Sequence, residues 1–235
     1  MKAIICSLLF YCGMAFGQDE PSKAKIFTFT PFAWKTGKVN GVAFGLGHFN
    51  WLRPMVRPGK TKEINGLNLE VNPFAPLMLL MFESPFDKPD ENVAVRVNGL
   101  HLSTIGFDGR VKMNGLAVSL YSKGAGTNGL SVTGTYNCTA KLNGLHIAGI
   151  TNFSDSSNGV LIAPFNYAEK FNGFEIGVVN QSFSFKGASI GFVNIADVSM
   201  TGIQIGLINI SGKNKGLQLG LWNKNAKRSL PLINW

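Results

Sequence analysis

The stretch Gly202-Ile-Gln-Ile-Gly-Leu-Ile-Asn209, followed by Gly216-Leu-Gln-Leu-Gly-Leu-Trp-Asn223, contains the repeated phrase that decides the fold of this chain. The same opening glycine recurs along the sequence at Gly41, Gly66, Gly99, Gly115, Gly129, Gly144, Gly159, Gly173, Gly187, Gly202 and Gly216. From Gly99 onward the steps are 16, 14, 15, 15, 14, 14, 15 and 14 residues. Such a period predicts a repeat architecture in which each unit packs on its neighbours.

Within a repeat, apolar residues occupy the first, third and fifth positions after the opening glycine, as in Ile203, Ile205 and Leu207. Small or polar residues, such as Gln204 and Gly206, fall between them. Alternation with a period of two predicts a β-strand with two unlike faces. We therefore expect the apolar face to be buried, in protein or in lipid, and the polar face to be exposed.

An asparagine closes each predicted strand, at a place that recurs with the same period as the glycine. Identical amides stacked in this way can hydrogen-bond from one repeat to the next. We therefore expect a structural Asn ladder through Asn166, Asn180, Asn194, Asn209 and Asn223.

Two all-β architectures fit this pattern. In a β-solenoid of about 14–15-residue coils, the apolar rows stack into a continuous core. In the alternative, an antiparallel outer-membrane-type β-barrel, the same rows face lipid. The strict repetition and the Asn ladder favour the solenoid. Against it, connectors such as residues 210–215 offer little apolar surface to cover the core from the other side.

The sequence predicts one repeat domain with additions at its N-terminal side. Residues 1–17 have the layout of a cleaved signal peptide, because Lys2 precedes an apolar run and a small-residue site. Residues 18–40 are expected to be an irregular N-terminal segment. Residues 41–235 form the β-repeat domain, with an insertion at about 73–92 where the glycine period is interrupted. Removal of residues 1–17 would leave Cys138 as the only cysteine, which excludes an intramolecular disulfide.

The charge of the chain is strongly basic, with a formal net charge of +9. Residues 198–235 contain no acidic side chain. This basic C-terminal stretch contains Lys213, Lys215, Lys224, Lys227 and Arg228. A patch of one sign can attract anionic lipid head groups or an acidic surface polymer, or it can simply keep a β protein soluble. Nucleic acid is a poor partner for an exported protein.

No group of residues points to catalysis. His101 and His146 share the second position of their repeats but lie three repeats apart. At about 4.8 Å per strand they are about 14 Å apart, too far to share a metal ion whose bonds are about 2 Å long. Glu175 and Asp197 do not recur as a facing carboxylate pair. We therefore expect no catalytic residue, no metal site, no cofactor and no enzymatic activity.

The polar face is expected to be the contact surface for a ligand. Most of its candidate residues project from one repeated position, and one aromatic lies near the basic end. The candidate ligand-binding residues are His101, His146, Glu175, Gln204, Gln218 and Trp222. The other interpretation is that these side chains only solvate a sheet.

The phrase Gly-Leu-Gln-Ile/Leu-Gly-Leu-x-Asn and the closing Arg228-Ser-Leu-Pro-Leu-Ile-Asn-Trp235 resemble a family of bacterial cell-envelope surface repeat-containing proteins. The resemblance is specific in the last two repeats and fades toward the N-terminus. It implies export and surface association, and it supplies no activity, cofactor or catalytic residue.

We therefore expect a non-enzymatic exported repeat protein that gives a rigid binding or structural surface in the bacterial envelope. Its expected location is the cell surface, the outer membrane or the periplasm. Expected partners are an envelope glycan, anionic lipid head groups or another surface protein. The alternative is an integral outer-membrane β-barrel with a transport or anchoring role.

Overall fold

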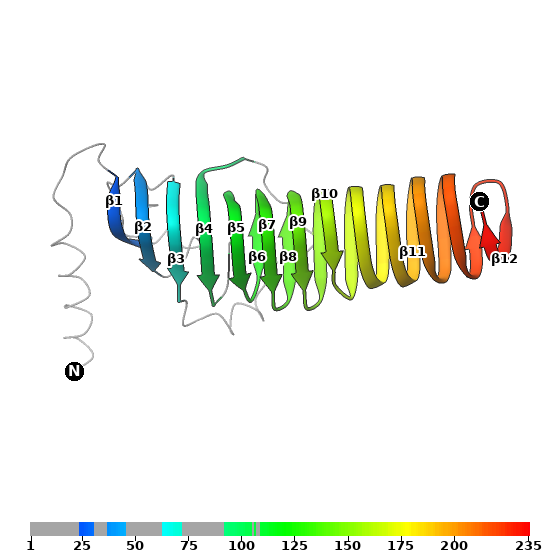
Figure 1. Cartoon of the computed structure of the whole chain (residues 1–235), viewed down its shortest axis with the longest axis horizontal. Helices are drawn as coiled ribbons and strands as arrows, with labels where there is room; N and C mark the ends of the chain where they lie inside the picture. The colour runs from blue at the N-terminus through cyan, green and yellow to red at the C-terminus, as the bar shows by residue number, and fades with distance from the viewer. Residues whose placement is uncertain (1–23, 31–36, 46–62, 72–91, 105, 107–108) are drawn as a thin grey trace.

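The chain folds as a β-solenoid, a stack of coils in which each strand pairs in parallel with the next (Figure 1). The computed structural model describes residues 24–30, 37–45, 63–71, 92–104, 106 and 109–235. Parallel pairing is the arrangement of the predicted solenoid and not of its antiparallel alternative. The prediction of a solenoid is therefore confirmed.

One side of the stack is formed by β1 together with the strands that contain the opening glycines up to Gly144. These strands are β1 (Lys25–Thr30), β2 (Lys38–Gly45), β3 (Glu63–Glu70), β4 (Val95–Ser103), β5 (Val111–Ser119), β7 (Gly126–Thr133) and β9 (Lys141–Ala148). Of these, β1 ends before the first opening glycine, and from β2 onward successive glycines face each other across every pair. Every repeat from Gly41 onward therefore occupies the same place in the stack.

The other side is formed by short return strands. They are β6 (Ser122–Gly124), β8 (Tyr136–Thr139) and the first residues of β10 (Thr151–Ile162). From there the coils run on without interruption through β11 (Phe165–Lys224), as the continuous ribbon in Figure 1 shows. The last strand, β12 (Ser229–Asn234), pairs with β11 in the antiparallel direction and closes the stack.

The opening glycines allow neighbouring coils to approach closely. Gly144 has a φ of 120°, which L side chains rarely adopt. A Cβ atom at Gly144 would overlap the carbonyl oxygen of Gly129 in the preceding coil. Conformation and space therefore both require glycine at this position.

The N-terminal end differs from the expected irregular segment at residues 18–40. β1 lies inside that range, and β2 begins at Lys38. β1 pairs in parallel with β2, with Phe29 opposite Phe44, so the stack begins before the first opening glycine. The expected signal peptide and nearly all of the expected insertion at 73–92 lie outside the described residues.

The interior is narrow, and only part of it is apolar. Two clusters of buried apolar side chains fill it, one around Ile64 and Met113 and the other around Leu142 and Phe171. Between and beyond them the interior is lined by polar side chains such as Asn209, Ser211 and Gln218. The stack is therefore stabilised by hydrogen bonds along its axis as well as by apolar packing.

Candidate functional site

The two faces of the strands have the opposite orientation to the one predicted. Gln204 is 1% exposed, whereas its neighbours Ile203 and Ile205 are 41% and 42% exposed. The second position after the glycine is buried in every coil: Ala43, Asn68, His101, Ala117, Ser131, His146, Leu161, Glu175, Ser189, Gln204 and Gln218. The expectation that polar side chains at this position form an exposed contact surface is therefore wrong.

The candidate ligand-binding residues consequently fall into two groups. Five of them lie in the interior, namely His101, His146, Glu175, Gln204 and Gln218, and none of these is more than 2% exposed. Trp222 alone is on the surface, with 51% of its area exposed. The five interior residues are therefore enclosed in the stack and are not part of its exposed surface.

Gln218 shows how the polar interior is satisfied. Its Nε2 donates to Gln204 Oε1 at 2.9 Å, and its Oε1 accepts from Asn234 Nδ2 of β12 at 2.9 Å. The row of glutamines therefore connects two coils to the closing strand.

Burial changes the ionisation of two of these interior residues. Burial raises the pKa of Glu175 to about 8, although a hydrogen bond with Ser189 opposes the shift. Burial lowers the pKa of His146 to about 4, although the backbone of Asn143 opposes that shift. Both side chains are therefore uncharged in the folded protein at neutral pH, as the narrow interior requires.

His101 belongs to a polar cluster in neighbouring coils. Asn68 Nδ2 lies 3.0 Å from His101 Nδ1 and donates to Glu70 Oε1 at 3.0 Å. All three side chains are at most 1% exposed. Enclosed in this way, the cluster holds two coils together but offers no access to a substrate.

The expected Asn ladder runs through the interior. The amide of Asn194 receives a hydrogen bond from Asn180 at 2.9 Å and donates one to Asn209 at 2.8 Å. The same Nδ2 of Asn194 also donates to the carbonyl oxygen of Ile205 at 3.0 Å. The inner Asn ladder consists of Asn152, Asn166, Asn180, Asn194, Asn209 and Asn223. Between Asn152 and Asn223, each coil is thus hydrogen-bonded to the next by a buried side chain as well as by backbone.

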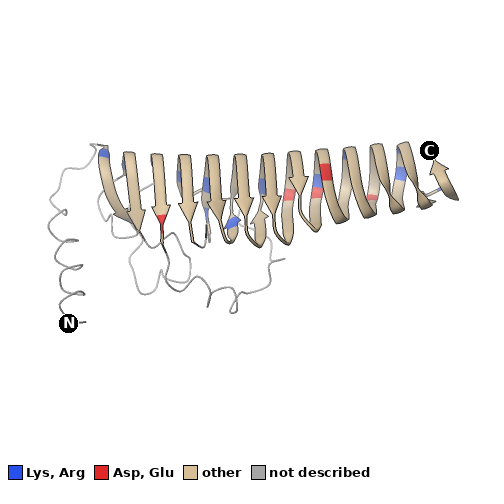
Figure 2. Cartoon of the chain, turned by 60° about the horizontal axis from the view of Figure 1, so that its bottom comes forward, with Lys and Arg blue, Asp and Glu red and all other residues tan. Residues whose placement is uncertain are grey.

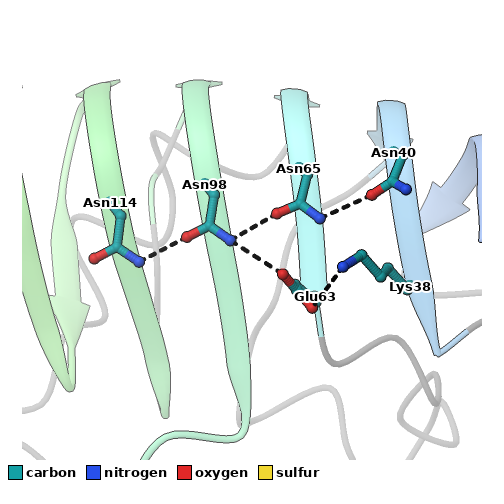
Figure 3. Close-up of polar contacts among 6 residues, drawn as sticks. All are labelled: Lys38, Asn40, Glu63, Asn65, Asn98 and Asn114. Atoms are coloured by element: carbon teal, nitrogen blue, oxygen red, sulfur yellow. Dashed lines mark hydrogen bonds and ion pairs between the residues drawn. The ribbon is translucent and has the colours of Figure 1, made fainter.

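A second ladder lies on the outer surface, immediately before the opening glycines. It consists of Asn40, Asn65, Asn98, Asn114, Asn128, Asn143, Asn158 and Asn172. Figure 3 shows its first members, where Lys38 also pairs with Glu63 at 3.4 Å. This outer Asn ladder was not predicted from the sequence, although the recurring Asn-Gly dipeptide was a signal for it.

An apolar face is formed on the outside of the stack by the first and third positions after the glycine. The first row is Val42, Leu67, Leu100, Leu116, Leu130, Leu145, Val160, Phe174, Ala188, Ile203 and Leu217. The third-position row is Phe44, Leu69, Leu102, Val118, Val132, Ile147, Ile162, Ile176, Ile190, Ile205 and Leu219. None of these side chains is buried. In the last coils, exposed Phe192, Leu207 and Leu221, at the fifth position after the glycine, widen this apolar face.

A basic rim borders the apolar face on the same strands. It occupies the outward positions three and one residues before the glycine. Its members are Lys38, Arg96, Lys112, Lys141, Lys170, Lys186, Lys213 and Lys215. Among the described residues Glu63 is the single acid in these two rows. Figure 2 shows basic residues along much of the stack and a smaller number of acidic ones.

The basic C-terminal stretch is only partly available to a partner. Arg228 Nε donates to Asn234 Oδ1 at 2.9 Å, and its guanidinium carbon lies 3.8 Å from the centre of the Trp235 ring. These contacts fix Arg228 against the closing strand. Lys213, Lys215, Lys224 and Lys227 remain at the surface of the last coils.

A shallow groove of about 300 Å³ runs along the outer surface across several coils. Its lining includes the outer-ladder residues Asn158 and Asn172, the rim residues Lys170 and Lys186, and the hydroxyl of Ser184. The groove therefore presents amide, hydroxyl and amino groups beside the rings of Phe171 and Phe185, and these groups repeat with the spacing of the coils.

No metal-binding constellation occurs in the part of the chain that the structure describes, since no three His, Cys, Asp or Glu side chains gather there. His101 and His146 lie on β4 and β9, with β5 and β7 between them. Cys138 is fully buried, and burial raises the pKa of its thiol to about 12.

The described residues also include no helix that is long and apolar enough to cross a membrane.

No protein-family model, no curated protein and no solved structure matches this chain. The apolar face, the basic rim and the groove are the features of the structure that bear on its function.

Proposed function

We propose that this protein is a non-enzymatic solenoid of the bacterial envelope, exported from the cytoplasm, whose apolar face is its interaction surface. The observation that carries the proposal is the outward orientation of two unbroken apolar rows. Monomeric proteins rarely expose a large contiguous apolar area, and where they do it normally marks an interaction site. A rigid stack suits this role, since its coils hold the rows in fixed positions.

The contacts inside the stack support a structural role for the inward polar residues of the repeat. The inner Asn ladder and the Gln204–Gln218 hydrogen bond hold coil to coil. Because the polar side chains of the repeat serve the interior, the outward rows are left as the repeated surface that a partner can meet.

Cell fractionation tests this function directly. In bacteria that produce the full chain, we expect the protein to sediment with the envelope. The double variant Ile190→Thr, Ile205→Thr keeps β-branched side chains in the strands and should release a large part of the protein into the soluble fraction. The matched control is Ile26→Thr, Val198→Thr, which changes exposed apolar residues outside the two rows.

Equal release of both double variants, or of neither, would contradict the role of the apolar face. A cytoplasmic location of the unaltered chain would contradict export. Thermal unfolding of the purified variants controls for loss of the fold.

The groove favours a second candidate function, binding of an envelope glycan. Amides of the outer Asn ladder and hydroxyls such as Ser184 can hydrogen-bond sugar hydroxyls, and Lys170 and Lys186 can pair with carboxylates. Co-sedimentation with purified, lipid-free cell-wall polysaccharide tests this candidate. Lys170→Gln with Lys186→Gln should weaken co-sedimentation, whereas Ile190→Thr with Ile205→Thr should leave it unchanged.

A further inference from the structure

We infer that the apolar face lies on the surface of a lipid bilayer that carries anionic head groups, with the basic rim at the level of those head groups. This inference rests on the proposed function, because it names what the apolar face contacts. It is carried by the size of the face and by the charge at its border.

The face is large enough for stable contact with a flat surface. Each row has eleven residues, so at about 4.8 Å per coil the face is about 50 Å long. Outward residues two apart in a strand are separated by about 6.7 Å, so two rows with their side chains are about 15 Å wide. The resulting area of about 700 Å² exceeds the roughly 300–600 Å² of the largest patch on a typical monomer.

The distribution of charge matches that of an interfacial membrane-binding surface. Such surfaces combine an apolar face that enters the head-group boundary with Lys and Arg at its border. In this protein the rim lies on the same strands as the apolar rows. In β9, for example, the outward residue Lys141 precedes the apolar pair Leu145 and Ile147. A juxtamembrane Lys or Arg contributes about 1 kcal/mol of attraction to an anionic leaflet.

A second copy of the chain fits the face less well. The two-fold axis of a face-to-face dimer lies in the plane of contact. If the axis runs along the strands, the two basic rims face each other. If it runs along the stack, each rim faces the opposite, apolar border, where Phe192 and Leu221 are exposed. Neither arrangement gives the rim an anionic partner, because Glu63 is the one acid in the described rim rows. Anionic lipid does.

Vesicle flotation with the full-length chain tests the inference. One set of vesicles is phosphatidylcholine alone, and the other contains phosphatidylglycerol as well. We expect flotation mainly with the anionic vesicles, and weaker flotation as salt is raised, because screening reduces the attraction of the rim. The double variant Lys112→Gln, Lys170→Gln should bind anionic vesicles about 30-fold more weakly.

Two controls separate the basic rim from basic charge in general. Lys224→Gln with Lys227→Gln removes the same charge outside the rim rows and should reduce binding less than threefold. Ile190→Thr with Ile205→Thr should weaken binding to both kinds of vesicle. Unfolding temperatures of all variants are compared with that of the unaltered chain.

Three results would overturn the inference. The first is the absence of flotation. The second is an equal effect of the two lysine pairs. The third is a stable dimer, seen by sedimentation equilibrium, that Ile190→Thr with Ile205→Thr converts to monomer. In the dimer case the proposed interaction role of the apolar face still stands, and its partner is a second copy. If the apolar variants alter neither vesicle binding, self-association nor envelope location, the proposed function fails as well.

Discussion

The inner and outer surfaces of the same strands differ in a way that reverses the usual expectation. In the coil that begins at Gly202, Gln204 and Asn209 face inward, and Ile203, Ile205 and Leu207 face outward. The interior of so narrow a coil holds few side chains, and stacked amides satisfy one another there. The interior of a solenoid can therefore be built for hydrogen bonding along the axis, while the apolar side chains of the same strands face outward.

The two Asn ladders give the largest expected contrast between inside and outside. Asn194→Ala removes the partner of Asn180 Nδ2 and of Asn209 in the buried ladder. Two or more buried polar groups are then left unpaired, each at about 1–3 kcal/mol, so we expect a loss of about 4 kcal/mol. Asn158→Ala makes the matched change in the outer Asn ladder, where water replaces the amide, and should cost less than about 1 kcal/mol.

Urea unfolding of the two asparagine variants, monitored by circular dichroism, measures this contrast. Similar losses in both would show that the ladders act in the same way and that water access does not distinguish them.

Gly144→Ala tests the close approach of adjacent coils. The substituted residue keeps an unfavourable φ, and its Cβ would force the backbone of Gly129 away. We expect a loss of about 3 kcal/mol. Gly37→Ala is the control, because nothing lies within 4 Å of a Cβ at Gly37, and it should change the stability by less than about 0.5 kcal/mol. A tolerated Gly144→Ala would contradict the close packing of the coils.

Glu175 makes the stability of the interior depend on pH. An ordinary Glu has a pKa of 4.5, and that of Glu175 is raised to about 8, so its contribution is fully present below pH 4.5 and lost as pH rises to about 8. His146, with its pKa lowered from 6.5 to about 4, acts in the opposite sense between these values. Above pH 6.5 the Glu175 contribution alone remains, and it decreases by about 2 kcal/mol up to pH 8.

Thermal unfolding of the unaltered chain and of Glu175→Gln between pH 6.5 and 8 checks this dependence. The variant should lose the downward slope and be more stable at pH 8. Parallel curves would show that Glu175 is ionised in the fold at neutral pH.

The smallest expected effect belongs to the apolar face itself. Ile205→Thr should change the free energy of unfolding by less than about 0.5 kcal/mol, because the side chain faces outward. Leu161→Thr, at an inward position that is 1% exposed, should cost about 3 kcal/mol. A large loss at Ile205 would show that the outward rows are buried in the folded protein and would contradict their role as an interaction surface.

Much of the fold follows from the sequence, because repetition and alternation are local signals. The period of the glycines predicted the coils, and the asparagines predicted the inner Asn ladder. β1 was missed because residues 25–30 contain no opening glycine, and the backbone of Ile26 takes that place opposite Gly41.

The direction of the faces could not be obtained from alternation alone, because alternation separates two faces without stating which one is inside. The decisive signal lay in the connectors. Residues 210–215 provide Ser211 and Asn214 but no apolar layer for Ile203 and Ile205 to pack against. The inward side chains of a polar return segment need polar partners such as Gln204 on the facing strand. This requirement places the candidate site residues in the interior.

The uniform register of the coils determines how this protein can change its length during evolution. Each coil between Gly173 and Gly216 meets its neighbours through the same glycine and the same inner asparagine. Duplication or deletion of one whole coil preserves every one of these contacts, whereas gain or loss of a few residues interrupts the ladder. Length can therefore vary in units of one coil, and the closing strand β12 must remain next to whichever coil is last.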